Sequence, residues 1–159
     1  MKDYIIREMR KDEYPLLDSF LYDAIYVHKG ETPPPYSIIY KPELQVYVEK
    51  IGEEKDDHIL VAEKDGNIVG AVWVRIMDDY GHVDDETPSL IISVKKEYRK
   101  MGIGRNLMER MIALLSSLGY EKVSLSTQKE NYALRLYLKL GFEIVEDKDD
   151  EYIMAKSLG

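Results

Sequence analysis

The chain has 159 residues, of which 45% are hydrophobic and 33% charged, and this length predicts one domain spanning residues 1–159. Its 22 basic and 30 acidic side chains give a formal net charge of −8, which argues against binding to nucleic acids or to anionic membranes. The absence of cysteine excludes disulfides, thiolate metal sites and a cysteine nucleophile.

The N-terminal half alternates between strand and helix patterns. Apolar residues at helical spacing predict a helix over residues 11–26, and Pro42 suits the first turn of a shorter helix over residues 42–51. Strands are predicted at residues 4–9, 58–63 and 68–77, and the turn signal Asp65-Gly66-Asn67 joins the last two as a hairpin. Residues 78–87 form a polar, acidic connection.

The C-terminal half adds strands at residues 88–94 and 123–126, a helix over residues 102–118 that Gly119 ends, and a helix over residues 131–140 that Gly141 ends. Residues 142–146 and 152–156 are expected to pair as a final hairpin. The order β-α-α-β-β-β-α-β-α-β-β predicts a mixed α/β domain whose helices cover one sheet.

Nothing in the sequence indicates export or membrane insertion. Residues 1–7 lack the apolar core of a signal peptide, and no run approaches the roughly 20 apolar residues of a membrane helix. His28, His58 and His82 are scattered, and none has another histidine three or four residues away. We therefore expect a cytoplasmic protein without a metal site.

One segment has the features of an anion site. The strand over residues 88–94 leads into a basic loop with Arg99, Lys100, Gly102, Gly104 and Arg105, and this loop opens a helix. Glycines let the backbone approach a ligand, and a helix start presents unpaired N–H groups with a partial positive charge. Leu107 stands where a dinucleotide fingerprint needs its third glycine, and no P-loop lysine motif is present.

The pattern Arg99-x-x-Gly102-x-Gly104 resembles the cofactor loop of the GCN5-related N-acetyltransferase (GNAT) superfamily. The stretch from Asn131 to Phe142 resembles the family's second motif, at the expected distance downstream. The resemblance implies a single-domain mixed central sheet flanked by helices, with a V-shaped split between its two central parallel strands, here residues 88–94 and 123–126.

The resemblance also implies acetyl-CoA as co-substrate, and it assigns roles to several residues. Backbone groups around Ile92 and Val94 would pair with the pantetheine arm. Asn131 would contact the cofactor arm, and Tyr137 would stand near the thioester sulfur as its proton donor. The pyrophosphate would be held by the backbone amides of Met101, Gly102, Ile103, Gly104 and Arg105, with Arg99 and Lys100 adding positive charge.

The acceptor amine has to lose a proton before it attacks a thioester, because a free alkyl amine has a pKa of about 10.4. The candidate bases are Asp84, Asp85 and Glu86, and Glu86 is preferred because it lies closest to the strand over residues 88–94. A solvated loop is the alternative interpretation of this cluster. A backbone N–H near Val94 is expected to stabilise the oxyanion.

The acceptor itself is left open by the sequence. We expect a small-molecule amine; the alternatives are a protein or peptide amine, and a CoA-binding sensor without turnover. Residues 30–35, with three prolines, form either a helix connection or a substrate-side loop, and Tyr22, Tyr26, Tyr36, Tyr40 and Tyr47 either line an acceptor pocket or cover the sheet. A homodimer is plausible for the class, but no interface is visible in the sequence.

Overall fold

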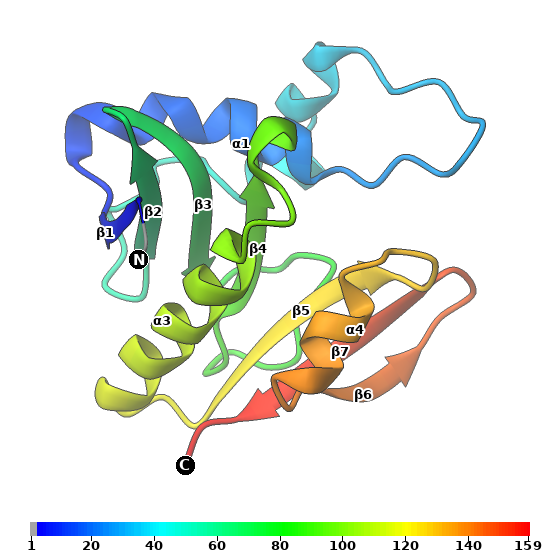
Figure 1. The fold of residues 1–159 in the computed structure, drawn as a ribbon. Helices are drawn as coiled ribbons and strands as arrows, with labels where there is room; N and C mark the ends of the chain where they lie inside the picture. Colours follow the sequence, from blue (N-terminus) through cyan, green and yellow to red (C-terminus); the bar gives the residue numbers. More distant parts are fainter. Residues whose placement is uncertain (1–2) are drawn as a thin grey trace.

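The computed structural model describes residues 3–159. Seven strands form one sheet in the order β1-β2-β3-β4-β5-β7-β6, in which every neighbouring pair is antiparallel except β4 and β5 (Figure 1). The strands are β1 (Ile5–Glu8), β2 (His58–Lys64), β3 (Asn67–Arg75), β4 (Ser89–Val94), β5 (Lys122–Gln128), β6 (Glu143–Asp147) and β7 (Glu151–Ser157). Each predicted strand is present within two residues at either end.

Four α-helices accompany the sheet: α1 (Leu17–Ala24), α2 (Pro42–Gln45), α3 (Ile103–Ser117) and α4 (Leu134–Lys139). Short 3₁₀ helices occupy residues 11–16, 36–40 and 96–98. Among the described residues, no helix has the length and hydropathy needed to span a bilayer.

Two apolar clusters cover opposite faces of the sheet. Met108, Met111 and Leu115 of α3 are fully buried in the first cluster, which also contains Tyr137 and Phe142. The second cluster contains Leu17 and Phe20 of α1 together with Trp73 of β3. The sheet therefore has an α3/α4 face and an α1/α2 face.

Three predicted helices are shorter than expected, and each has a local cause. Pro15 lacks a backbone N–H, so residues 11–16 form a 3₁₀ helix and α1 begins at Leu17. In the stretch predicted as helix over residues 42–51, α2 ends at Gln45, and buried side chains of β3 bind the carbonyls of Val46 and Tyr47. The helix predicted over residues 131–140 begins at Leu134, because the side chain of Asn131 bonds the N–H of Ala133 in a preceding turn.

Candidate functional site

The sheet opens between β4 and β5. These strands pair in parallel where Ser89 lies opposite Ser124, and the N–H of Ser124 donates to the carbonyl of Pro88 at 3.0 Å. Beyond this seam they diverge (Figure 1). This is the V-shaped split that the sequence resemblance implied.

The divergence leaves one edge of β4 without a strand partner. The N–H of Lys95 donates to Val69 on the β3 side, and hydrogen-bonding direction alternates along an antiparallel strand. The peptide groups of Leu90, Ile92 and Val94 therefore point into the split. The Val94 carbonyl accepts a 3.0 Å hydrogen bond from the Arg99 side chain, whereas Ile92 presents both its donor and its acceptor to the split.

The loop after β4 has the geometry of an anion cradle. Gly102 caps α3 in the left-handed region, with φ +82°. The first α3 hydrogen bond runs from Asn106 to Gly102, so the N–H groups of Ile103, Gly104 and Arg105 have no intrahelical acceptor. A Cβ added to Gly102 would meet no atom within 4 Å, so the space beside this backbone is open. The loop thus fits a phosphate-bearing ligand.

The other predicted loop residues differ in their surroundings. Met101 and Lys100 are exposed, and Lys100 also adopts a positive φ of 65°. The side chain of Ile103 is anchored in the α3/α4 core, and Arg105 forms an exposed 3.0 Å ion pair with Glu109 one turn along α3. Only the backbone of Ile103 is therefore available to a ligand.

A cavity of about 580 Å³ lies at the split. Its lining comes from both faces: α1, α2 and the loop after β3 on one side, and β4, β5, α4 and the β6–β7 turn on the other. Three predicted residues, Ile92, Asn131 and Tyr137, meet in this lining. Val94, the 99–105 loop and Glu86 lie outside it.

Tyr137 enters the cavity from α4. Its ring packs edge-on against Phe142, with ring centroids 6.1 Å apart, and its side chain is 8% exposed. Burial raises the pKa of Tyr137 to about 12, so the hydroxyl stays protonated at neutral pH. Asn131 lies nearby in the lining, and its own N–H donates to the carbonyl of Gln128 at 3.0 Å.

The predicted acidic candidates do not gather at the cavity. Glu86 is exposed and precedes the joined end of the split. Asp84 accepts hydrogen bonds from the Glu86 N–H and from Lys122, and hydrogen bonding from Thr87 and Glu86 lowers its pKa to about 2, which makes it a weak base. Asp85 is almost fully exposed. The geometry therefore favours the alternative interpretation, a solvated loop.

Asp79 is one of four carboxylates in the cavity lining, and the sequence analysis did not single it out as the base. Its Oδ1 accepts a 2.8 Å hydrogen bond from Ser89, which is fully buried. Burial raises the pKa of Asp79, although hydrogen bonds from Ser89, Gly81 and Tyr47 oppose the shift.

Gly81 lets the loop after β3 pack closely against β5, where β4 and β5 pair. The Ser124 hydroxyl donates to the Gly81 carbonyl at 2.7 Å, and a Cβ on Gly81 would lie 3.1 Å from the backbone of Leu125 and Ser126. Glycine favours such a close approach, because a Cβ here would press against the backbone of β5. This glycine, two residues after Asp79, was the available sequence signal for a buried loop.

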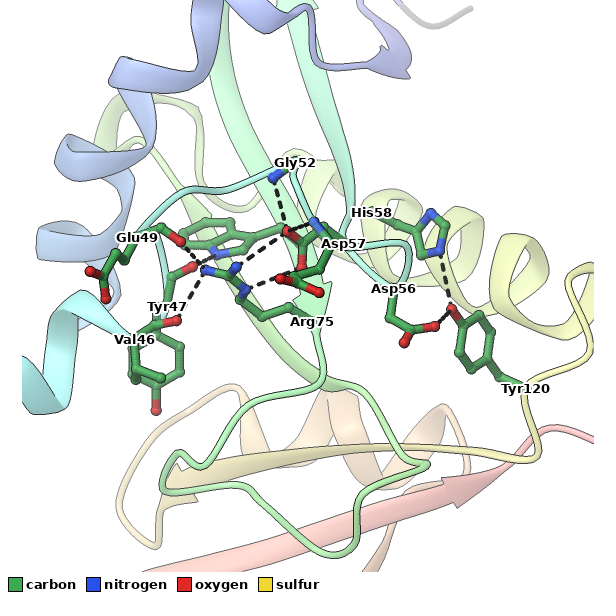
Figure 2. Close-up of polar contacts among 11 residues, drawn as sticks. Val46, Tyr47, Glu49, Gly52, Asp56, Asp57, His58, Arg75 and Tyr120 are labelled. Carbon is green, nitrogen blue, oxygen red and sulfur yellow. Dashed lines mark hydrogen bonds and ion pairs between the residues drawn. The ribbon is translucent and has the colours of Figure 1, made fainter.

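Tyr47 lies beside Asp79, and two buried residues of β3 bind the backbone of residues 46–49. Figure 2 shows the contacts of Arg75 with this segment. The indole N–H of Trp73 donates to the Tyr47 carbonyl at 2.9 Å, and Arg75 donates to the carbonyls of Val46 and Glu49 at 3.2 and 2.8 Å. Arg75 in turn forms a 3.1 Å ion pair with Asp57, whose side chain is fully buried. Of the five tyrosines considered above, Tyr26 and Tyr47 line the cavity.

The loop between α1 and α2, which contains the three prolines, reaches across the split. Near its start, the Tyr26 hydroxyl donates to the carbonyl of Glu130 at 3.3 Å, and His28 Nδ1 lies 3.0 Å from the Glu130 carboxylate. Near its end, the Pro34 carbonyl accepts a 2.5 Å hydrogen bond from Tyr22 of α1. We call residues 25–35 the strap, because they connect the α1 side of the split to the segment after β5.

Comparison with known proteins agrees with this geometry. The family model described as "Acetyltransferase (GNAT) family" matches residues 21–142. A probable N-acetyltransferase camello from Xenopus tropicalis is 36% identical over 84 residues, and a mycothiol acetyltransferase from Propionibacterium freudenreichii is 29% identical over 100 residues. These alignments cover 52% and 62% of the chain but 37% and 31% of the relatives, so the chain matches about a third of their length.

Solved structures resemble the chain over nearly its whole length. A GNAT-family acetyltransferase from Streptococcus pneumoniae superimposes with a TM-score of 0.70 at 24% identity, covering 98% of this chain and 99% of that one. The PaiA N-acetyltransferase from Thermoplasma acidophilum, solved with coenzyme A, gives 0.73 at 17% identity, covering 98% and 99%. At these identities the likeness establishes the fold.

Proposed function

The chain belongs to the acetyltransferase (GNAT) family, and from this premise we propose that it transfers an acetyl group from acetyl-CoA to the primary amine of a small molecule. The observation that carries the proposal is the cavity at the split. It joins the free edge of β4 and Tyr137 to the carboxylate of Asp79.

The described residues fit acetyl-CoA, which when bound supplies the thioester that the amine attacks. The N–H and C=O of Ile92 offer an added-strand pairing to the pantetheine arm. The free N–H groups at the start of α3, with Arg99 and Lys100 nearby, offer a pyrophosphate site. Asn131, in the cavity lining, contacts the arm in this arrangement.

Asp79 is the base that we propose in place of Glu86. The acceptor amine arrives protonated at neutral pH, since alkyl amines have a pKa of about 10.4, and it has to lose that proton before attack. Asp79 lines the cavity from the α1/α2 face, and Ser89 and Tyr47 orient its carboxylate. Its raised pKa makes it a stronger base than an exposed aspartate, and it accepts the proton directly or through water.

Tyr137 and the β4 backbone stabilise negative charge during the reaction, Tyr137 on the departing thiolate and β4 on the oxyanion. The Tyr137 hydroxyl has a pKa of about 12, above the 8.5 or so of an alkyl thiol, so it stabilises the departing thiolate by donating a hydrogen bond rather than by complete proton transfer. The N–H of Val94, which also points into the split, serves the oxyanion. Without cysteine no acetyl-cysteine intermediate can form, and we propose direct transfer in a ternary complex.

The strap supports a small acceptor over a protein one. An extended peptide needs an open groove, whereas the contacts of Tyr26 and His28 with Glu130 bridge the two sides of the split. These contacts confine the acceptor to the space between the strap and the seam.

Titration calorimetry with acetyl-CoA, followed by thiol detection during incubation with a panel of amines, tests the proposal. We expect cofactor binding, and coenzyme A release with small amines but not with peptides of matched charge. Faster release with peptides would favour the protein acetyltransferase. Binding without release by any amine would favour a CoA sensor, and no binding would refute all three functions.

A further inference from the structure

The base of the strap is fixed to α1. The Tyr22 hydroxyl donates to the carbonyl of Pro34, and the Tyr22 ring packs against that of Tyr36, with ring centroids 5.2 Å apart. The strap therefore leaves α1 and returns to the same helix, and prolines 33–35 stiffen its returning limb. Any movement of the strap is thus confined to its tip, residues 26–31.

The tip joins two walls of the cavity. Tyr26 of the strap and Gln128 of β5 both belong to the cavity lining. The Tyr26 hydroxyl donates to the Glu130 carbonyl at 3.3 Å, which is long for a hydroxyl donor, whereas His28 Nδ1 lies 3.0 Å from the Glu130 carboxylate. His28 is therefore the stronger of these two links across the split.

His28 faces two hydrogen-bonding side chains that stand on one turn. The N–H of Asn131 donates to the Gln128 carbonyl at 3.0 Å, so residues 128–131 form a turn that carries both Gln128 and Glu130. The side chain of Gln128 hydrogen-bonds the His28 ring, as the Glu130 carboxylate does. A neutral imidazole donates one N–H, whereas an imidazolium donates two and also carries a charge that attracts Glu130. The link is therefore strongest when the ring is protonated.

The surroundings of the ring favour its protonated form. The titratable groups that face His28 are Glu130, from the segment after β5, and Glu31 and Tyr26, from the strap itself. Hydrogen bonding to Glu130 raises the pKa of His28, and the charges of Glu31 and Glu130 add to this effect, although desolvation opposes it. With the pKa raised above 6.5 in the closed strap, the link is complete below pH 6.5 and is lost as pH rises through the raised value.

We propose that His28 is a pH-dependent clasp: its protonated ring holds the tip of the strap to residues 128–130, and its neutral ring lets the tip move away from the cavity. The inference rests on the proposed function, because it describes how access to the same site is regulated. A closed tip confines an acceptor amine between the strap and β5, whereas an open tip leaves that side of the cavity to solvent.

Hydrogen exchange of the strap amides tests the clasp without acetyl-CoA or an amine. Protection factors, normalised to the intrinsic exchange rate at each pH, should fall about threefold in the tip between pH 6 and pH 8.5, because one partly exposed pair contributes little. His28→Gln should remove this pH dependence and leave protection low throughout. His28→Lys, which stays charged over the range, should keep protection high throughout. His58→Gln, on β2 beside Tyr120, is the control and should behave like the wild type.

Protection of the wild-type tip that does not change with pH would overturn the clasp, whether or not the chain acetylates amines. A loss of the change in His58→Gln would overturn it equally. Where an amine is acetylated, its KM should be the same in the wild type and His28→Lys at pH 6, and higher in the wild type at pH 8.5. Equal KM values at both pH values would refute control of the acceptor by the strap and leave the acetyltransferase intact. If no amine is acetylated, the exchange result alone decides.

Discussion

Asp79 illustrates what it costs to bury the carboxylate that we propose as the base. Burial raises its pKa, so the folded protein holds that proton more tightly than the unfolded chain. Between the unfolded pKa of 3.8 and the raised folded value, stability therefore falls as pH rises, and it remains lowered at pH 7. The ionised carboxylate that the proposed mechanism needs is therefore the form that folding disfavours.

The replacement Asp79→Asn should separate the effect of this carboxylate on stability from its proposed role in catalysis. Asparagine can still accept the Ser89 hydrogen bond, so we expect a higher free energy of unfolding at pH 7, with a gain that shrinks as pH falls from the raised folded pKa towards 3.8 and is absent below it. We expect kcat to fall by roughly a hundredfold or more, and the acidic limb of the pH–rate profile to disappear. Urea unfolding and initial rates across pH measure both. A variant that keeps full activity would remove Asp79 from the mechanism.

Tyr137→Phe tests the hydroxyl alone. The phenyl ring keeps its edge-on contact with Phe142, so folding and acetyl-CoA affinity should hardly change. Loss of the hydrogen bond to the developing thiolate should lower kcat roughly a hundredfold. Steady-state kinetics and calorimetry give the two quantities, and undiminished kcat would assign Tyr137 a packing role.

Two glycines flank α3, and they allow a matched test of the anion cradle. Gly102 precedes the helix with φ +82° and Gly119 follows it with φ +91°, and a Cβ on either would meet no atom within 4 Å. Alanine at either position costs about 1–2 kcal/mol of stability, because the left-handed region disfavours a Cβ. Gly102→Ala should in addition weaken acetyl-CoA binding, measured by calorimetry, whereas Gly119→Ala should not. Equal affinities in the two variants would contradict the pyrophosphate site.

The ion pair between Arg75 and Asp57 fixes the segment that carries Tyr47 (Figure 2). Arg75→Met leaves the fully buried Asp57 carboxylate without its cation and should cost about 3–5 kcal/mol in urea unfolding. Adding Asp57→Asn should recover part of that loss. Glu109→Gln breaks an exposed pair with Arg105 and should cost under about 1 kcal/mol. Similar costs for both single variants would show that burial does not set the strength of the Arg75 pair.

The elements differ in how far sequence predicted them. The strands and α3 follow from periodicity, because their apolar residues face a core directly. The stretch over residues 46–51 could not be predicted as a turn, because its carbonyls are bound by Trp73 and Arg75, some 25 residues away in sequence. Asp79 was missed for a related reason: its burial depends on Gly81 folding against β5. The cofactor loop can be predicted from its local sequence pattern. The proposed acceptor side cannot, because it is formed by contacts between residues far apart in the sequence.

Across the whole molecule, the split sheet separates a side suited to an anion from a side suited to a cation. The α3/α4 side presents helix N–H groups and basic residues at the end of β4, which suit an anion. The α1/α2 side presents the carboxylate of Asp79, which suits a cation. Opposite charges can therefore approach from opposite faces and meet at the seam, although the chain as a whole carries a net charge of −8.

This net charge predicts that salt weakens acceptor capture. An acidic chain attracts a cationic amine over a range set by the Debye length, which shrinks from about 30 Å at 0.01 M to about 8 Å at 0.15 M salt. The KM of a cationic amine should therefore rise with ionic strength, because salt screens its charge. Initial rates in sodium chloride, compared with a neutral solute at equal osmolality, separate screening from crowding. A KM that does not respond to salt would mean that short-range contacts in the cavity, and not the field of the whole chain, capture the acceptor.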